Sequence, residues 1–316
     1  MKVVVFGAGA IGSLLGARLA VVGHDVCLIG RAPLVRVVRA HGLRVAGVRP
    51  GRVEVRAATA LSAPTDAEAI LLSVKTFDLD GAIASIGAAV PLPQPTLLPQ
   101  NGLGVLEHVT PRFERAGWAA APAVLVRAVN SIPAHWQAIG VVQQPGEGEI
   151  VLSETERAGA AGPSTQRWAE LLASGGIPVR RVPDLARELW RKALVNAAIN
   201  PVSALARVPN GRLRDAPFRA RAWALLREAQ RAAAAAGVPI PDAEADRALE
   251  RILQATAANR SSMLQDVERG RPTEIDAISG EILRIAEARG IDLPATRAVV
   301  AELAAARRPG AGRQPS

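Results

Sequence analysis

The chain has 316 residues, of which 49% are hydrophobic and 21% are charged, a composition typical of globular proteins that bury a large core. Its net charge of +9 comes from dispersed arginines, with no tyrosine and no basic stripe among aromatic residues. This argues against a nucleic-acid partner and indicates a small anionic molecule. One cysteine, Cys27, excludes an internal disulfide, and the four histidines are too scattered for a metal site.

No targeting or membrane segment is expected. Glycines interrupt the apolar stretch after Met1-Lys2, and no run reaches the ~18 apolar residues that a membrane span needs. We therefore expect no export, no membrane partner and a reducing, cytoplasmic setting. The sequence leaves the oligomeric state open, with a homodimer as one alternative to a monomer.

The first half of the chain alternates short apolar runs with helical patterns, which is typical of parallel β-α-β units. A helix is expected over 10–22, and a last extended piece leads to a domain boundary near residue 183. The expected strands lie at 3–6, 25–29, 69–74, 96–98, 121–129 and 149–152. The pattern predicts an α/β Rossmann-type dinucleotide-binding domain over residues 1–183.

The second half is almost wholly helical. Asp184 is a plausible N-cap, and Pro239 and Pro241 separate two long helices rich in alanine and arginine. Because one core rarely extends beyond about 250 to 300 residues, this half is expected to form its own all-α domain over 184–306. Residues 307–316 are expected to be a disordered tail.

A glycine motif, Gly7-Ala8-Gly9-Ala10-Ile11-Gly12, directly follows the first strand and opens the first helix. Gly7 permits a tight turn, Gly9 lets the backbone approach a pyrophosphate, and Gly12 allows close packing of helix on strand. The N–H groups at the helix N-terminus then face the anion. The alternative is a tight turn without a ligand, but the strand-helix context favours dinucleotide binding.

Cofactor choice depends on the end of the second strand, which reads Leu28-Ile29-Gly30-Arg31. An NAD enzyme usually places an acidic residue there, whereas Asp25 lies at the opposite end of the strand. Arg31 could grip a 2′-phosphate through its planar guanidinium, which indicates NADP(H). A chance surface arginine is the alternative in so arginine-rich a chain.

Two polar residues follow later strands of the same sheet. Lys75 closes the strand at 69–74, and Asn101 follows the strand at 96–98. Because ligands of open α/β sheets bind outside the carboxyl ends of the strands, both side chains are candidate ligand contacts. For Asn101, a simple Asn-Gly turn is an equally good explanation from the sequence alone.

Lysine and asparagine are scarce, which makes their positions informative. Lys2, Lys75 and Lys192 are the only lysines among 38 basic residues. Unlike arginine, a lysine can be tuned to give up a proton. Asn196 and Asn200 follow Lys192 at four-residue steps, so the three fall within about 80° of one helix face. This polar stripe in an apolar helix makes Lys192 a candidate proton donor.

Six blocks of sequence, in order, resemble the ketopantoate reductase (2-dehydropantoate 2-reductase) family, from residue 7 to near residue 306. Five of the six asparagines of the chain fall within these blocks. The glycine motif marks only nucleotide binding, whereas the lysine-asparagine helix and the Ser-Met-Leu-Gln-Asp segment are specific to the family. The blocks are Gly7–Gly12, Ser73-Val-Lys75, Asn101-Gly102, Lys192-x3-Asn196-x3-Asn200-Pro201, Pro209-Asn210-Gly211 and Asn259-x2-Ser262-Met-Leu-Gln-Asp266-x7-Glu274-Ile-Asp276.

The resemblance implies reduction of 2-dehydropantoate to (R)-pantoate with NADPH, a step of pantothenate biosynthesis. It implies that Lys192 protonates the oxygen that gains charge when hydride reaches C2. The amides of Asn196, Asn200, Asn210 and Asn259 would bind substrate oxygens and Ser262 the carboxylate, with Lys192 also touching the substrate. Asn101 would touch both nicotinamide and substrate, and Lys75 the cofactor. Glu274 would hold the nicotinamide ribose, the substrate hydroxyl or Lys192.

Several alternatives stay open at this level. Asn196 and Asn200 could satisfy nearby backbone groups, Ser262 could cap a turn, and Glu274 could serve a helix N-terminus. The strand at 124–128 departs from the family, which usually has small or threonine-rich residues near the cofactor. The whole chain could also be a reductase of another 2-oxo or 3-hydroxy acid, or a non-catalytic NADPH-binding sensor.

Overall fold

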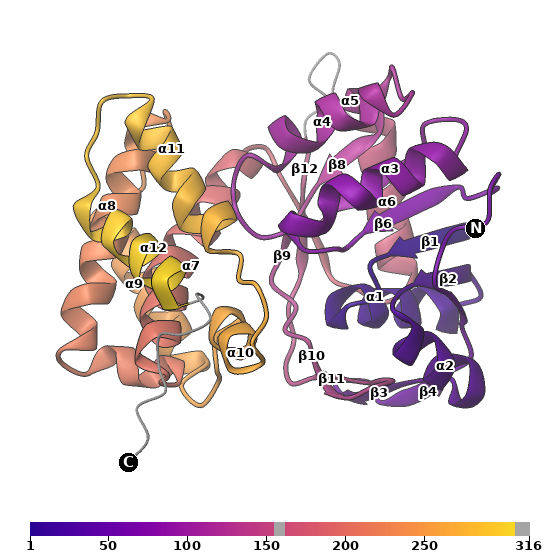
Figure 1. Cartoon of the computed structure of the whole chain (residues 1–316), viewed down its shortest axis with the longest axis horizontal. Helices are drawn as coiled ribbons and strands as arrows, with labels where there is room; N and C mark the ends of the chain where they lie inside the picture. Colours follow the sequence, from indigo (N-terminus) through magenta and orange to yellow (C-terminus); the bar gives the residue numbers. More distant parts are fainter. Residues whose placement is uncertain (155–161, 307–316) are drawn as a thin grey trace. The chain divides into compact units, whose positions relative to one another are not determined.

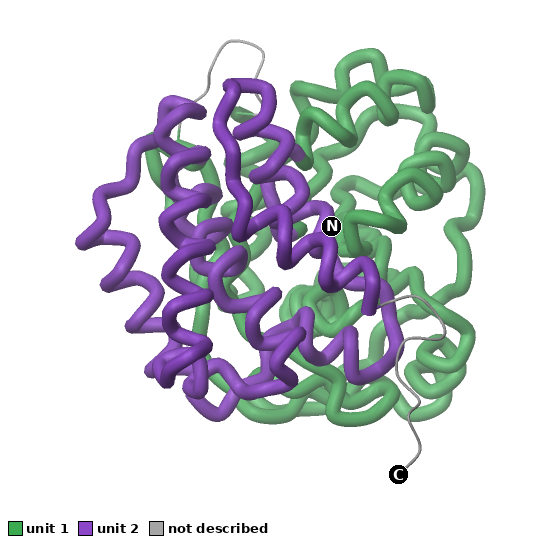
Figure 2. The backbone as a smooth tube through the Cα atoms, turned by 60° about the vertical axis from the view of Figure 1, so that its left-hand side comes forward, with its two compact units in different colours: residues 1–100, 105–185 green, residues 101–104, 186–316 purple. Residues whose placement is uncertain are grey.

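The computed structural model describes residues 1–154 and 162–306 of the chain. These form two compact units, coloured separately in Figure 2. The first comprises Met1–Gln100 and Val105–Leu185, and the second comprises Asn101–Gly104 and the chain from Ala186 onward. The sequence predicts one boundary near residue 183, whereas the chain also enters the second unit for four residues after Gln100. The expected disordered tail at 307–316 lies outside the described residues.

A six-stranded sheet forms the centre of the first unit, in the order β5-β2-β1-β6-β7-β8. Figure 1 labels β1, β2, β6 and β8 of this sheet. All five pairings are parallel, so the carboxyl ends of the strands lie along one edge of the sheet. The strands are β1 (Lys2–Phe6), β2 (Asp25–Ile29), β5 (Arg56–Ala58), β6 (Ala69–Leu72), β7 (Thr96–Leu98) and β8 (Leu125–Arg127).

Helices cover both faces of this sheet, as a parallel sheet requires. On one face, the core joins the sheet to α1 (Ala10–Val21), α2 (Ala32–His41) and α6 (Gly162–Ser174). On the other face, it joins the sheet to α3 (Leu79–Ala89) and α4 (Val105–Arg115). The predicted α/β Rossmann-type domain is therefore confirmed.

Two smaller sheets complete the first unit. One has the strand order β10-β11-β3-β4 and the other β13-β12-β9. The expected strand at 121–129 is wrong over its first four residues, because Pro122 sits in the first turn of a short helix, α5 (Ala121–Val124). The expected strand at 149–152 and the extended piece before residue 183 are confirmed as β12 (Ile150–Ser153) and β13 (Val179–Val182). The other strands of these sheets are β3 (Leu43–Gly47), β4 (Gly51–Val53), β9 (Val129–Asn130), β10 (His135–Ala138) and β11 (Val141–Gln144).

The second unit is helical, which confirms the predicted all-α domain. Its core gathers side chains from α7, α8 and α9 and from the elements after residue 276. Within 1–154 and 162–306, no helix is both long and apolar enough to cross a membrane. The helices are α7 (Leu185–Ala206), α8 (Phe218–Ala235), α9 (Asp242–Ala255), α10 (Ser262–Glu268), α11 (Glu281–Glu287) and α12 (Pro294–Ala306), with short turns η1 (Thr76–Asp78), η2 (Asn210–Arg214) and η3 (Asp276–Gly280).

A buried carboxylate ties α8 to the start of α12. Glu228 is 5% exposed, and its oxygens accept hydrogen bonds from the backbone N–H groups of Ala295 (2.9 Å) and Thr296 (2.7 Å) and from the Thr296 hydroxyl (2.7 Å). A carboxylate at a helix N-terminus satisfies N–H groups that have no helical partner and is favoured by the helix dipole.

Replacing Glu228 with alanine is expected to lower the free energy of unfolding by about 2 to 4 kcal/mol, because buried N–H groups are left without acceptors. Denaturant-induced unfolding measures this change. Glu302→Ala is the matched control, since Glu302 forms an exposed ion pair with Arg221 and such pairs contribute about 0 to 1 kcal/mol. Equal losses in the two variants would contradict the assignment of Glu228 as the cap.

Candidate active site

The glycine loop has the three features that the motif predicts. Gly7 has a φ of +101°, and a Cβ there would lie 2.6 Å from the Val74 nitrogen. A Cβ on Gly12 would lie 2.4 Å from the Gly7 oxygen, so both positions exclude any larger residue. A Cβ on Gly9, in contrast, would meet no atom within 4 Å. The backbone at Gly9 is therefore open to a ligand.

Hydrogen bonds hold this loop against the end of β2. The backbone N–H groups of Gly7 and Ala8 both donate to the Ile29 oxygen, at 3.1 and 2.8 Å. Gly9 is the N-cap of α1 and brings no side-chain acceptor, so the N–H groups of the first helical turn, from Ala10 to Gly12, have no helical partner. Such a helix start is suited to bind a phosphate.

Arg31 lies beside the same loop. It directly follows Gly30, whose Cβ position lies 2.9 Å from the Ala8 Cβ, and it is the exposed N-cap residue of α2. Asp25, at the far end of β2, pairs with Arg56 at 2.7 Å. An arginine, and not this aspartate, therefore directly follows the residue that packs against the glycine loop.

Lys75 and Asn101 follow the carboxyl ends of β6 and β7. Lys75 is half-buried and is the N-cap residue of η1. Asn101 donates through Nδ2 to Oε2 of Glu274 at 3.4 Å. Gly102 has a φ of +90°, and a Cβ there would lie 2.2 Å from the Ala277 oxygen. The turn at 101–104 therefore packs closely against the segment that carries Glu274.

The lysine-asparagine stripe lies on α7, where most neighbouring residues are buried. Lys192 and Asn196 are half-buried, and Asn200 is 5% exposed. The adjacent Arg191 points to another side of the helix, where it pairs with Glu188 and Glu244, each at 3.2 Å. Arg191 therefore links α7 to α9 through the Glu244 carboxylate.

Asn210 and Asn259 lie on neighbouring segments. The Asn210 N–H donates to the Asn259 oxygen at 2.9 Å, and its side-chain Nδ2 donates to the Thr256 hydroxyl at 2.9 Å. Among the described residues, Oδ1 of the buried Asn210 accepts no hydrogen bond. The Asn210 side chain therefore offers a vacant acceptor, while Asn259 is exposed.

Ser262 is not the cap that its position suggested. The hydroxyl of the preceding residue, Ser261, accepts the Leu264 N–H at 3.1 Å and caps α10. Ser262 is the first residue of that helix and is exposed. Its hydroxyl is therefore not needed to cap the helix.

The sequence did not single out two buried polar residues at the carboxyl edge of the sheet, Gln100 and Arg127, each 7% exposed. Burial lowers the pKa of the Arg127 guanidinium to about 10, although Glu107 opposes the shift, so Arg127 stays charged at neutral pH. Nor did the sequence identify Asn101 as the partner of Glu274. For Arg127, the available signal in the sequence was a charged residue inside the apolar run at 124–128.

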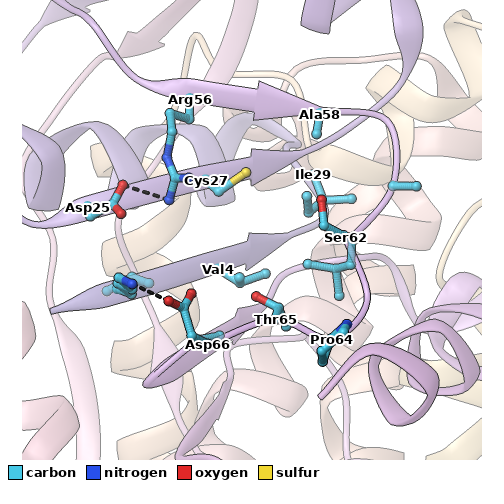
Figure 3. A pocket seen from close by; sticks show the side chains of 15 residues that line it. Val4, Asp25, Cys27, Ile29, Arg56, Ala58, Ser62, Pro64, Thr65 and Asp66 are labelled. Carbon is cyan, nitrogen blue, oxygen red and sulfur yellow. Dashed lines mark hydrogen bonds and ion pairs between the residues drawn. The ribbon is translucent and has the colours of Figure 1, made fainter. Parts of the chain in front are cut away.

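A cavity of about 510 Å³ lies over another part of the sheet and contains none of the predicted site residues (Figure 3). Strands β1, β2 and β5 supply its floor, and the segment at 60–67 lines its other side. Cys27 faces it, and burial raises the pKa of that thiol. Ion pairs Lys2–Asp66 and Asp25–Arg56 lie at one end. The cavity is thus distinct from the glycine loop.

Comparison with known proteins identifies relatives along nearly the whole chain. Family models described as "Ketopantoate reductase PanE/ApbA" and its C-terminal domain match residues 3–157 and 184–307. A 2-dehydropantoate 2-reductase from Archaeoglobus fulgidus is 32% identical over 95% of each chain. The crystal structure of a PanE/ApbA family ketopantoate reductase from Ralstonia eutropha JMP134 is 31% identical, covers 97% of this chain and 98% of that one, and has a TM-score of 0.86.

A structure of D-mandelate dehydrogenase with NADH and anilino(oxo)acetate has a TM-score of 0.87 at 22% identity, over 97% of this chain and 98% of that one. At this identity the likeness shows the shared fold alone. The family models and the relatives above 30% identity carry the assignment of family. The chain belongs to the ketopantoate reductase PanE/ApbA family.

Proposed function

We propose that this protein reduces 2-dehydropantoate to (R)-pantoate with NADPH, in pantothenate biosynthesis. The single observation that carries the proposal is the polar stripe of α7, Lys192, Asn196 and Asn200, on a helix whose residues from Ala193 to Ala204 are mostly buried. Lysine is scarce in this chain, and its ammonium can donate a proton. Relatives that carry this reductase name match 95% of the chain, which supports the same reaction here.

The first unit would hold the nucleotide. The open backbone at Gly9 and the N–H groups of Ala10 to Gly12 fit a pyrophosphate. Arg31 would bind the 2′-phosphate through its guanidinium, and Lys75 would contact the cofactor near the end of β6. When bound, NADPH supplies the hydride that adds to C2 of the 2-oxo acid.

The second unit would bind the substrate and donate a proton to it. The ammonium of Lys192 would stabilise the negative charge that develops on the former carbonyl oxygen and donate a proton to it. Asn196, Asn200, Asn210 and Asn259 would bind substrate hydroxyl and carbonyl groups, and the free hydroxyl of Ser262 the carboxylate.

Asn101 and Glu274 would act together. Because the carboxylate of Glu274 can only accept, its contact with Nδ2 of Asn101 turns Oδ1 of that amide away from it. Asn101 would thereby present an acceptor to the nicotinamide amide or to a substrate hydroxyl. Glu274 would also bind the cofactor on the nicotinamide side.

A reducing, cytoplasmic setting suits the proposed reaction, since the one cysteine, Cys27, is free. A homodimer is proposed as the form to test first, and sedimentation measurements on the full chain would distinguish it from a monomer. A nucleic-acid partner is not proposed.

The direct test follows NADPH oxidation at 340 nm with 2-dehydropantoate and with a panel of 2-oxo acids that differ in size and in the presence of a hydroxyl group. We expect kcat/KM to be highest for 2-dehydropantoate. A higher value for another acid would reassign the substrate within the same chemistry. NADPH binding without turnover of any acid would instead indicate a nucleotide-binding sensor.

Replacing Arg31 with alanine is expected to raise KM for NADPH about 10- to 100-fold and to leave KM for NADH nearly unchanged, because a charge-assisted hydrogen bond to phosphate contributes about 1.5 to 3 kcal/mol. Steady-state kinetics with both nucleotides measures the difference. Arg44→Ala, at an exposed position of β3, is the matched control. A parallel loss with NADH and NADPH would show that Arg31 does not read the 2′-phosphate.

A further inference from the structure

Two buried side chains brace the carboxyl ends of three neighbouring strands, β6, β7 and β8. Gln100 donates through Nε2 to the oxygens of Leu72, at 2.6 Å, and Val74, at 3.3 Å. Arg127 donates through Nη1 to the oxygens of Leu98 and Ala128, both at 2.8 Å. Gln100 therefore joins the end of β7 to the end of β6, and Arg127 joins the end of β8 to the end of β7.

The sequence explains why side chains are needed here. Pro99 directly follows β7 and has no N–H with which to continue the backbone ladder toward β6. The side-chain amide of Gln100 supplies the missing donor instead, since the oxygens of Leu72 and Val74 both accept hydrogen bonds from it. At β8, the Leu98 oxygen already accepts the Ala128 N–H at 3.1 Å, and Arg127 adds a second donor to it. Buried carbonyl groups without such donors would be costly.

The braced positions are those that precede two expected ligand contacts. Val74, which accepts from Gln100, is bonded to Lys75, and Gln100 itself is bonded to Asn101. Through its own side chain, Gln100 thus fixes the spacing between the end of β6 and the point where the chain leaves β7. Arg127 fixes the Leu98 end of the same stretch from the other side. Neither residue needs to touch a ligand to affect binding.

We propose that Gln100 and Arg127 are positioning residues, which hold Lys75 and Asn101 where they bind the nicotinamide dinucleotide. The proposal rests on the proposed function only in taking that nucleotide as the ligand. A displacement of about 1 Å at a reacting centre can lower turnover by about 100-fold, so the positions of contact residues matter. We therefore expect that loss of the Gln100 or Arg127 hydrogen bonds weakens nucleotide binding by displacing Lys75 and Asn101.

The test uses Gln100→Leu and Arg127→Met in the full chain, which remove the donors and keep approximate side-chain size. Gln137→Leu and Arg44→Met, at exposed positions of β10 and β3, are the matched controls. NADPH binding is followed by nucleotide fluorescence without any substrate, so the result does not depend on turnover of 2-dehydropantoate. We expect the dissociation constant to rise about 10-fold in each brace variant and less than 2-fold in the controls.

A double-mutant cycle separates positioning from general loss of stability. If Gln100 acts through Lys75, Gln100→Leu weakens NADPH binding 10-fold in the native background but less than 3-fold when Lys75 is already alanine. Arg127→Met is paired with Asn101→Ala in the same way. Fully additive losses, or lower melting temperatures with unchanged NADPH affinity, would overturn the proposal.

Conservative variants keep the test decisive if a donor-free variant does not fold. Arg127→Lys keeps the charge but lacks the planar fork, and Gln100→Asn keeps the amide but shortens its reach. Each is expected to raise the NADPH dissociation constant by at least 3-fold at a temperature well below its unfolding transition. Native affinity in both would overturn the proposal. Absence of 2-dehydropantoate reduction by the native chain would reject the reaction and leave these binding results intact.

Discussion

Replacing Lys192 with alanine is expected to lower kcat for 2-dehydropantoate by about 100- to 10,000-fold, the usual contribution of a positioned general acid. The affinity for NADPH is expected to stay within 2-fold of native, because the proposed nucleotide contacts lie mainly in the first unit. Stopped-flow or steady-state NADPH oxidation measures turnover, and nucleotide fluorescence measures binding. A large loss of kcat together with an unchanged NADPH affinity identifies a residue that acts on the reacting oxygen.

Two further variants sharpen this prediction. Lys192→Arg keeps a positive charge but does not readily release a proton, so it is expected to recover substrate binding more than turnover. Arg191→Ala, the adjacent residue on α7, is the matched control, since it removes ion pairs with Glu188 and Glu244 and leaves the polar stripe unchanged. Native turnover in Lys192→Ala would reject Lys192 as the proton donor.

Features that depend on local sequence could be predicted. The alternation of apolar runs and helical patterns predicted the parallel sheet. The glycine motif predicted that the backbone is crowded at Gly7 and Gly12 and open at Gly9. Gly12 has neighbours that exclude a Cβ, and Gly9 has none. These properties follow from chain geometry within a few residues, which a single sequence contains.

Features that depend on contacts between distant residues could not be predicted in the same way. Asn101 and Glu274 are 173 positions apart, and no spacing rule pairs them. The helical start of the 121–129 region also escaped prediction, because an apolar run of this length suits a strand or a short helix, and only Pro122 favoured the helix. The strand at 124–128 was noted as atypical, but the buried Arg127 within it and its carbonyl partners became visible only in the fold.

The glycine loop offers a test in which stability and nucleotide binding separate. Gly12→Ala would bring a Cβ to 2.4 Å from the Gly7 oxygen, so we expect it to lower the free energy of unfolding by about 1 to 3 kcal/mol through overpacking. Gly9→Ala places its Cβ in open space, at a φ of −74° that alanine adopts readily. We therefore expect native stability for Gly9→Ala.

The same Cβ at position 9 would stand where the pyrophosphate must approach the backbone, so Gly9→Ala is expected to weaken NADPH binding about 10- to 100-fold, or ~1.4 to 2.8 kcal/mol. Gly81→Ala is the matched control, because its Cβ also meets nothing within 4 Å but lies on α3, where alanine is expected to stabilise the helix by about 0.5 to 1 kcal/mol. Titration with NADPH and thermal unfolding of all three variants give both quantities. Native NADPH affinity in Gly9→Ala would mean that the open backbone at Gly9 does not face the nucleotide, and the loop would then be a tight turn without a ligand.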